Sequence, residues 1–271
     1  MPVWKTLRSV TPATLPLVLA GCMIGGDFGV REQADWTGTY TLAPGGELSM
    51  TNTNGVIEVR AWDQPKIEVR AEKIARAGTR EKAREALAAI EITERVRPDA
   101  VEIETKLPQG GSGGILPMLL GGAGNFRVDY HVRAPADALV RLQTSNGKVS
   151  VIGIRGGTKA QATNGGVDGE DLGGHVVART TNGYVRVGVR EIKGDGVELR
   201  TTNGVIALKM PATAGADLSA RVTNGAISLD DVTLEANGTT SRRRVEGRVN
   251  GGGPRVELET TNGSIRISGV R

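Results

Sequence analysis

The dipeptide Asn-Gly returns along this chain of 271 residues at nearly constant intervals. From Asn146 onward the intervals are 18, 18, 21 and 21 residues, and then 26 and 12. A period near 20 residues is typical of repeat architectures, in which similar units stack on one another. The chain is therefore expected to be built from repeated units, whose asparagines are Asn54, Asn146, Asn164, Asn182, Asn203, Asn224, Asn250 and Asn262.

The residues on both sides of the dipeptide follow a period of two. Two and four residues after the glycine the side chain is apolar in most units, as at Val185 and Val187. Four residues before the asparagine it is again apolar, as at Leu199, and two residues before it is small, as at Thr201. Because alternate side chains of a strand face the same side, this pattern predicts a strand on each side of every Asn-Gly.

Two all-β folds are compatible with such strands. Asn-Gly is a strong signal for a tight hairpin, so a sandwich or prism of separate hairpins is one of them. The other is a β-solenoid or β-helix-like repeat stack, in which each Asn-Gly forms a corner that lies on the corner of the next unit. The constant interval and the small residue before the turn favour the stack, because separate hairpins need neither.

The residue types at the expected corners suit this stack. Glycine adopts a positive φ without strain, and asparagine tolerates it better than most residues. Stacked asparagines can also hydrogen-bond along the stack, as amide ladders do. The predicted structural corners are Asn54, Gly55, Asn146, Gly147, Asn164, Gly165, Asn182, Gly183, Asn203, Gly204, Asn224, Gly225, Asn262 and Gly263.

Two segments interrupt the repeat. Residues 79–92 predict a helix that Thr79 caps, with Ala83, Leu87 and Ile90 on one apolar face. We expect it to cap the end or side of the sheet, and a partner-binding helix is the alternative. Residues 109–125 form a glycine-rich loop around a short apolar core, which is too short to cross a bilayer. This loop is expected to be disordered or packed on the core, with contact to a lipid surface or a partner as the alternative.

The N-terminus has the layout of a secretory signal. Lys5 and Arg8 precede an apolar stretch that ends in small residues before Cys22, the one cysteine of the chain. "LAGC" resembles the bacterial lipobox, which implies cleavage before Cys22 and lipidation of that residue. Met23 follows the cysteine, at the position where an aspartate favours retention in the inner membrane. Because that aspartate is absent, the resemblance implies the outer membrane. The expected organisation is a signal peptide over 1–21, a lipidated tether over 22–36 and a β-repeat domain over 37–271.

Composition and motifs argue against several classes of function. The net charge is +4, and loss of Lys5 and Arg8 with the signal leaves about +2 (4 − 2), too little for a nucleic-acid-binding protein. The histidines, His131 and His175, have no histidine or cysteine near them in sequence, so no zinc site is expected. No catalytic residue, metal or cofactor is predicted. Two acidic clusters contain Asp168, Glu170 and Asp171, and Asp230 and Asp231. They are interpreted as solvated turns, with a calcium site or an acid–base pair as the alternative.

Three further features bear on binding. Trp62 and Tyr184 lie in repeat units, where an exposed ring would form a platform for a sugar and a packed ring would be structural. The basic run Ser241–Arg248 is either a solvated loop or a contact for an acidic envelope polymer.

The repeats, the lipobox and the segments "WTGTYTL" and "TNGVIEVRAW" together resemble the bacterial putative-adhesin family of β-strand-repeat proteins. The resemblance covers residues 37–271, implies the fold and an adhesin-like role, and brings no catalytic residues. The sequence is accordingly interpreted as a non-enzymatic, lipid-anchored envelope protein that presents a rigid β-repeat surface to a polysaccharide or protein partner. A periplasm-facing structural or envelope-stress protein is the alternative, followed by a polysaccharide-active enzyme.

Overall fold

The computed structural model describes residues 29–107, 126–235 and 239–270. The expected signal peptide, Cys22 and the glycine-rich loop at 109–125 lie outside these residues. No helix of the described part is long and apolar enough to cross a membrane.

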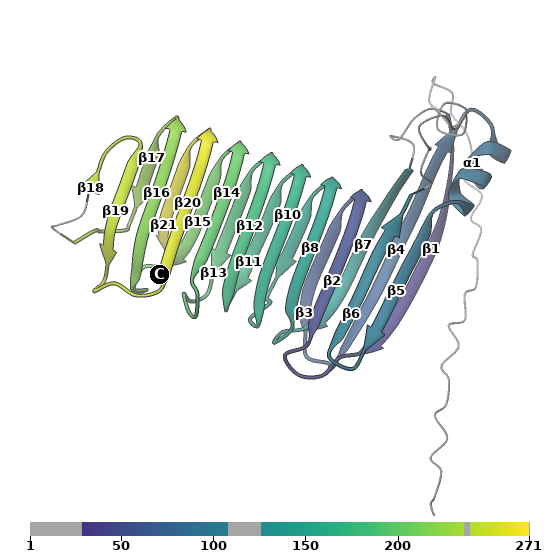
Figure 1. Ribbon diagram of the computed structural model, residues 1–271, viewed down its shortest axis with the longest axis horizontal. Coiled ribbons are helices and arrows are strands. Elements are labelled where there is room, and N and C mark those ends of the chain that lie inside the picture. Colours follow the sequence, from purple (N-terminus) through teal and green to yellow (C-terminus); the bar gives the residue numbers. More distant parts are fainter. Residues whose placement is uncertain (1–28, 108–125, 236–238, 271) are drawn as a thin grey trace, which may run out of the picture.

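Two large β-sheets face each other and form the body of the protein, which confirms the all-β prediction (Figure 1). The ten-stranded sheet contains, in order, β1 (Val30–Thr41), β4 (Lys66–Ala77), β7 (Phe126–Pro135), β3 (Ile57–Trp62), β9 (Val149–Ile152), β11 (Val167–Leu172), β13 (Val185–Val189), β15 (Ile206–Pro211), β21 (Ile265–Val270) and β17 (Ile227–Asp230). The eleven-stranded sheet contains β18 (Thr239–Thr240), β19 (Arg244–Val249), β16 (Ala216–Asn224), β20 (Arg255–Asn262), β14 (Val197–Asn203), β12 (His175–Asn182), β10 (Gly157–Asn164), β8 (Leu139–Asn146), β2 (Glu47–Asn54), β6 (Ala100–Lys106) and β5 (Glu91–Arg97).

Each corner Asn-Gly joins a strand of the eleven-stranded sheet to a strand of the ten-stranded sheet. The strands β12 and β13, for example, flank Asn182 and lie in different sheets. Instead of pairing with each other, they pair in parallel with the equivalent strands of neighbouring units. The alternative of separate Asn-Gly hairpins is therefore wrong. We call each strand–Asn-Gly–strand unit a rung and name it by its asparagine.

The side chains of the corner asparagines form a continuous ladder. Asn182 Nδ2 donates to Asn164 Oδ1 at 3.0 Å, and Asn203 Nδ2 donates to Asn182 Oδ1 at 2.8 Å. The same contact links all seven corner asparagines, in the order Asn54, Asn146, Asn164, Asn182, Asn203, Asn262 and Asn224. The predicted amide ladder is thus confirmed. Asn250 lies outside it and binds the carbonyl oxygens of Ala212 and Ala214.

The glycine after each asparagine is required mainly by close approach between turns. A Cβ atom on Gly183 would lie 2.1 Å from the carbonyl oxygen of Gly165, in the neighbouring rung. The φ of Gly183 is 157°, at the margin of the region that favours glycine. The backbone N–H of Gly183 donates to the carbonyl oxygen of Asn203 at 2.9 Å, so the turns stack at hydrogen-bonding distance. Any side chain would therefore separate the rungs.

The core lies between the two sheets and follows the predicted inward positions. Leu199, Val185 and Ile206 are fully buried, as are their counterparts in most rungs. The small residue two before the asparagine also has a polar role, because Thr180 Oγ1 donates to the carbonyl oxygen of Gly165 at 2.8 Å. Thr201 and Thr260 make the same contact with Gly183 and Gly204, respectively. Each hydroxyl thus joins its strand to a neighbouring turn.

The rungs do not stack in chain order at the C-terminal end. Strands β20 and β21 of the Asn262 rung lie between the Asn203 rung and the Asn224 rung (Figure 1). The expectation that each rung packs on the next in sequence is wrong here. Because β17 of the Asn224 rung is the edge of its sheet, Ile227 and Leu229 are only partly buried, although the repeat pattern assigns them to the core.

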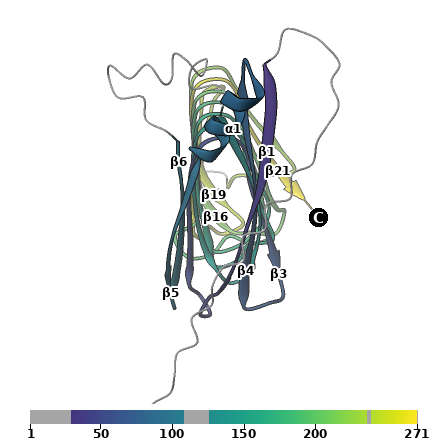
Figure 2. The same ribbon diagram turned by 90° about the vertical axis from the view of Figure 1, so that its right-hand side faces the viewer.

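The N-terminal end is closed by antiparallel strands and a helix. Helix α1 (Arg80–Ala88) contacts β1 and β4 at this end of the body (Figure 2). Thr79 Oγ1 accepts a hydrogen bond from the backbone N–H of Lys82 at 3.3 Å, so the predicted cap is confirmed. The helix is shorter than the predicted 79–92, because the chain turns into β5 at Glu91. Residues 30–36 of the expected tether belong to β1, which pairs with β4 along its whole length.

Replacement of Asn182 by Ala removes one donated and one accepted hydrogen bond from the ladder. We expect this change to lower the free energy of unfolding by about 1–2 kcal/mol. Asn224→Ala is the matched control, because Asn224 lies at the end of the ladder and its side chain makes only the bond to Asn262 in the described residues. Its expected loss is about half as large. Urea denaturation measures the unfolding free energy of both variants. Equal losses would contradict the ladder as the cause of the destabilisation.

Gly183→Ala places a Cβ against the carbonyl oxygen of Gly165, so it must push two rungs apart. We expect a loss of at least about 2 kcal/mol in unfolding free energy, or failure to fold. Gly188→Ala is the control, since a Cβ there meets only one atom, at 3.8 Å. It should be neutral or stabilising by up to about 1 kcal/mol. Similar stability of the two variants in urea would show that the turns do not need this close approach.

Candidate contact surface

In the first of the two acidic clusters noted in the sequence, Asp168 and Asp171 form ion pairs. Asp168 accepts a hydrogen bond from Tyr184 Oη at 3.0 Å and pairs with Lys148 Nζ at 2.7 Å. Asp171 pairs with Arg190 at 2.6 Å, and this contact lowers the pKa of the Asp171 carboxyl. The contact with Asp168 raises the pKa of Lys148. These two carboxylates therefore join neighbouring rungs, which solvated turns alone would not do.

The second cluster and the two histidines lie apart from one another. Asp230 is 3.6 Å from Arg266, and Asp231 adopts a positive φ of 55° in the turn after β17. His131 lies on β7 of the ten-stranded sheet and His175 on β12 of the eleven-stranded sheet. Among residues 29–107, 126–235 and 239–270, no three His, Cys, Asp or Glu side chains are grouped so that they could hold a metal ion.

Both aromatic rings proposed as sugar platforms are covered by arginine. The Arg186 guanidinium carbon lies 4.0 Å from the centre of the Tyr184 ring. The ring also fills the space above Gly166, where a Cβ would lie 2.3 Å from it. Trp62 donates from Nε1 to the carbonyl oxygen of Lys66 at 2.7 Å, with the Arg133 guanidinium carbon 5.7 Å from its ring centre. Each ring therefore has an arginine against one face, and the Tyr184 ring also packs on the neighbouring rung.

The basic run Ser241–Arg248 is partly neutralised. Arg244 and Arg221 both pair with Glu246, at 2.8 Å and 2.7 Å. Arg248 pairs with Glu235 at 3.2 Å. Arg242 and Arg243 have no carboxylate partner in the described part of the chain and lie in the turn before β19. The run is thus mainly part of the antiparallel end of the eleven-stranded sheet.

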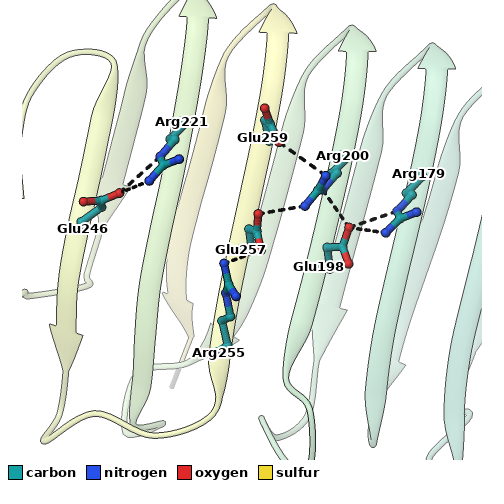
Figure 3. Close-up of polar contacts among 8 residues, drawn as sticks. All are labelled: Arg179, Glu198, Arg200, Arg221, Glu246, Arg255, Glu257 and Glu259. Carbon is teal, nitrogen blue, oxygen red and sulfur yellow. Dashed lines mark hydrogen bonds and ion pairs between the residues drawn. The ribbon is translucent and has the colours of Figure 1, made fainter.

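A network of arginines and glutamates crosses the outer face of the eleven-stranded sheet (Figure 3). Arg200 on β14 lies at its centre, 2.7 Å from Glu198 and 2.9 Å from Glu257. Its third partner is Glu259, at 3.7 Å. The other pairs join Arg179 to Glu198, Arg255 to Glu257 and Arg221 to Glu246. The eight side chains that Figure 3 labels are four arginines and four glutamates, whose formal charges cancel.

The order of the rungs makes this network possible. Arg200, Glu259 and Arg221 occupy equivalent positions on the adjacent strands β14, β20 and β16. Arg200 already lies beside Arg179 on one side, and if the rungs stacked in chain order it would have Arg221 on the other, with no glutamate at this position between like charges. This network was not predicted from the sequence. The repeated "RTTNG" marks the arginines of the network in the sequence. Which glutamates they pair with depends on which rungs are neighbours.

A row of threonines lies beside the corner asparagines on this face. The residue before each corner asparagine is exposed in most rungs, and it is a threonine at Thr163, Thr181, Thr202, Thr223 and Thr261. A shallow hollow of about 420 Å³ lies between this threonine row and the arginine row. A second hollow, of about 600 Å³, lies on the outer face of the ten-stranded sheet, and Arg60, Lys148, Arg186 and Lys209 contribute to its lining.

Comparison with known proteins gives a likeness in fold. No protein-family model matches the sequence, and no curated protein matches it. The chain is similar to a solved structure named "putative cell adhesion protein" from Clostridium sporogenes ATCC 15579, with a TM-score of 0.50 and 14% identity, covering 87% of this chain and 100% of that one. A "putative adhesin" from Bacteroides fragilis NCTC 9343 matches 87% of this chain and 97% of its own at 10% identity, but its TM-score of 0.33 supports no conclusion. At these identities the first likeness shows the fold alone.

The ion pairs of Glu246 predict a pH dependence. Hydrogen bonds from Arg244 and Arg221 lower the pKa of Glu246 from 4.5 to about 2. Between these two pH values the unfolded chain binds the proton and the folded protein does not, so stability falls as pH decreases from about 4.5 to about 2. We expect the stability of the Glu246→Gln variant to decline less over this pH range than that of the unmodified protein. The midpoint of urea denaturation, measured at each pH, checks this.

Glu81→Gln is the matched control for this pH dependence. Glu81 is exposed on α1 and has no ion pair among the described residues. This variant should keep the decline of the unmodified protein. The assignment to Glu246 fails if both variants follow the same curve.

Proposed function

We propose that this protein is a lipid-anchored, non-enzymatic protein of the bacterial cell envelope that uses a rigid β-solenoid for adhesion or partner contact. The anchor is the lipid on Cys22, which the "LAGC" segment predicts. Two or more acyl chains hold a protein stably at a membrane where a single chain does not. The absence of aspartate at position 23 favours the outer membrane.

The observation that carries the proposal is the locked register of the rungs. The asparagine ladder aligns equivalent positions of successive rungs, so outward side chains repeat at the strand spacing of about 4.8 Å. A rigid array of similar sites gains overall affinity for a repetitive partner, because each contact raises the local concentration for the next. An envelope polysaccharide or a protein with repeated epitopes is the partner that fits such an array.

A catalytic role is less well supported. The carboxylates Asp168 and Asp171 are each bound by a lysine or arginine, which leaves little freedom for proton transfer. A likeness in fold to a protein named for cell adhesion agrees with contact rather than catalysis.

A periplasm-facing structural or envelope-stress protein is the second candidate. The neutral Arg–Glu network on the eleven-stranded sheet favours it, because these side chains already satisfy one another (Figure 3). The two candidates differ in which side of the membrane the body faces.

Protease treatment of intact cells distinguishes them. A cleavable tag after Arg271 should be lost from intact cells if the body faces outward, as adhesion requires. Lysed cells are the control for accessibility of the tag. Loss only after lysis would overturn the adhesion proposal and support the periplasmic alternative.

The lipid anchor is tested by Cys22→Ser in the same cells. We expect the unmodified protein in the membrane fraction and the Cys22→Ser protein in the soluble fraction after lysis. Retention of the variant in the membrane would contradict lipid anchoring through Cys22.

A further inference from the structure

A hollow on the outer face of the ten-stranded sheet has different chemistry from the neutral network on the opposite sheet. It has a volume of about 600 Å³ and extends over β3, β9, β11, β13 and β15. Its floor consists of small outward residues, Ser150, Gly188 and Ala207. Five strands with spacings of about 4.8 Å make it about 19 Å long, which suits an extended polymer.

Two cations of this hollow have no acidic partner among the residues that the structure describes. Arg186 and Lys209 lie on adjacent strands, opposite Ala207 and Gly188 in the register. Both are exposed, and neither forms an ion pair with any described residue. Nearby, Lys148 pairs with Asp168 and Arg60 pairs with Glu58. Within this hollow the positive charge is therefore free at Arg186 and Lys209.

The Arg186 guanidinium is held in place before any ligand arrives. It lies 4.0 Å from the ring centre of Tyr184, and the hydroxyl of that ring donates to Asp168. Gly166 leaves room for the ring to lie flat against the neighbouring rung. Because the side chain is already ordered, less conformational entropy is lost when it binds an anion.

The hollow also contains hydrogen-bond acceptors. Glu170 is exposed at its margin and has no ion pair in the part of the chain that the structure describes. A free carboxylate accepts hydrogen bonds from hydroxyl groups. A ligand for this hollow thus needs an anionic group for Arg186 and Lys209 and hydroxyl groups for Glu170.

We propose that this hollow binds an acidic polysaccharide, whose anionic groups contact Arg186 and Lys209 while the sugar chain lies over Gly188 and Ala207. The anionic group is either the carboxylate of a uronic acid or a phosphate ester. This inference rests on the proposed contact function and names the ligand class and the face that binds it. It places the acidic polymer elsewhere than the sequence-based alternative, which considered the run Ser241–Arg248 as its contact.

Calorimetric titration of the purified full chain in detergent tests the site. The probes are an oligogalacturonate for the carboxylate, a phosphomannan for the phosphate ester and neutral dextran as the uncharged control. We expect one of the acidic probes to bind, more weakly at high salt, and dextran not to bind. Binding of only one identifies the anionic group, and absence of binding by both overturns the proposal.

Two variants separate charge from shape. Arg186→Gln with Lys209→Gln should weaken binding by at least about tenfold, since two charged contacts are lost. Gly188→Leu fills the floor without changing charge, and its Cβ would meet only one atom, at 3.8 Å. We expect this variant to weaken binding by about fivefold or more, equivalent to roughly 1 kcal/mol.

Arg242→Gln with Arg243→Gln is the matched control, because it removes the same charge from exposed arginines outside the hollow. Its affinity should stay within about twofold of the unmodified protein. Equal loss in both double variants, or loss only in the control, would overturn the assignment to the hollow. Binding in solution does not depend on which way the body faces the membrane, so this result is independent of the protease test of the proposed function.

Discussion

The stacking of the Asn-Gly turns is the constraint on which the rest of the structure depends. Each turn lies so close to the next that a Cβ on Gly183 would lie 2.1 Å from the carbonyl oxygen of Gly165. The asparagine side chains then join rung to rung by amide hydrogen bonds of 2.8–3.0 Å. Because these contacts fix the position of every rung along the strand direction, inward residues meet in buried rows and outward residues meet in exposed rows. The core and both surfaces are consequences of one local contact.

The same register determines which charges become neighbours. The Asn203 and Asn224 rungs each carry an arginine at the same position, Arg200 and Arg221. The Asn262 rung, which lies between them, supplies Glu257 and Glu259 to the network around Arg200. Insertion of this rung therefore replaces a repulsive contact between cations by attractive ones. Exposed ion pairs contribute little to stability individually, but they discriminate between alternative orders of otherwise similar rungs.

The two outer faces differ in their readiness for a ligand. On the eleven-stranded sheet, Arg179 and Arg200 are already paired with glutamates, and a ligand would have to replace these partners. On the ten-stranded sheet, Arg186 and Lys209 flank small residues and have no acidic partner among the described residues. A contact protein with this structure would keep one face inert and use the other, which is consistent with both the proposed function and the inferred ligand class.

The sequence by itself determined the features that depend on local pattern. The period of the Asn-Gly dipeptides, the inward rows such as Leu199 and Val185, and the cap at Thr79 follow from residues close together in the chain. The order of the rungs, the start of β1 at Val30 and the pairing of Arg200 with Glu259 were decided by tertiary structure alone. The physical reason is that similar rungs carry the same backbone pattern, so any two of them can pair. Only the contacts between side chains distant in sequence select one arrangement, and a period along the chain does not record them.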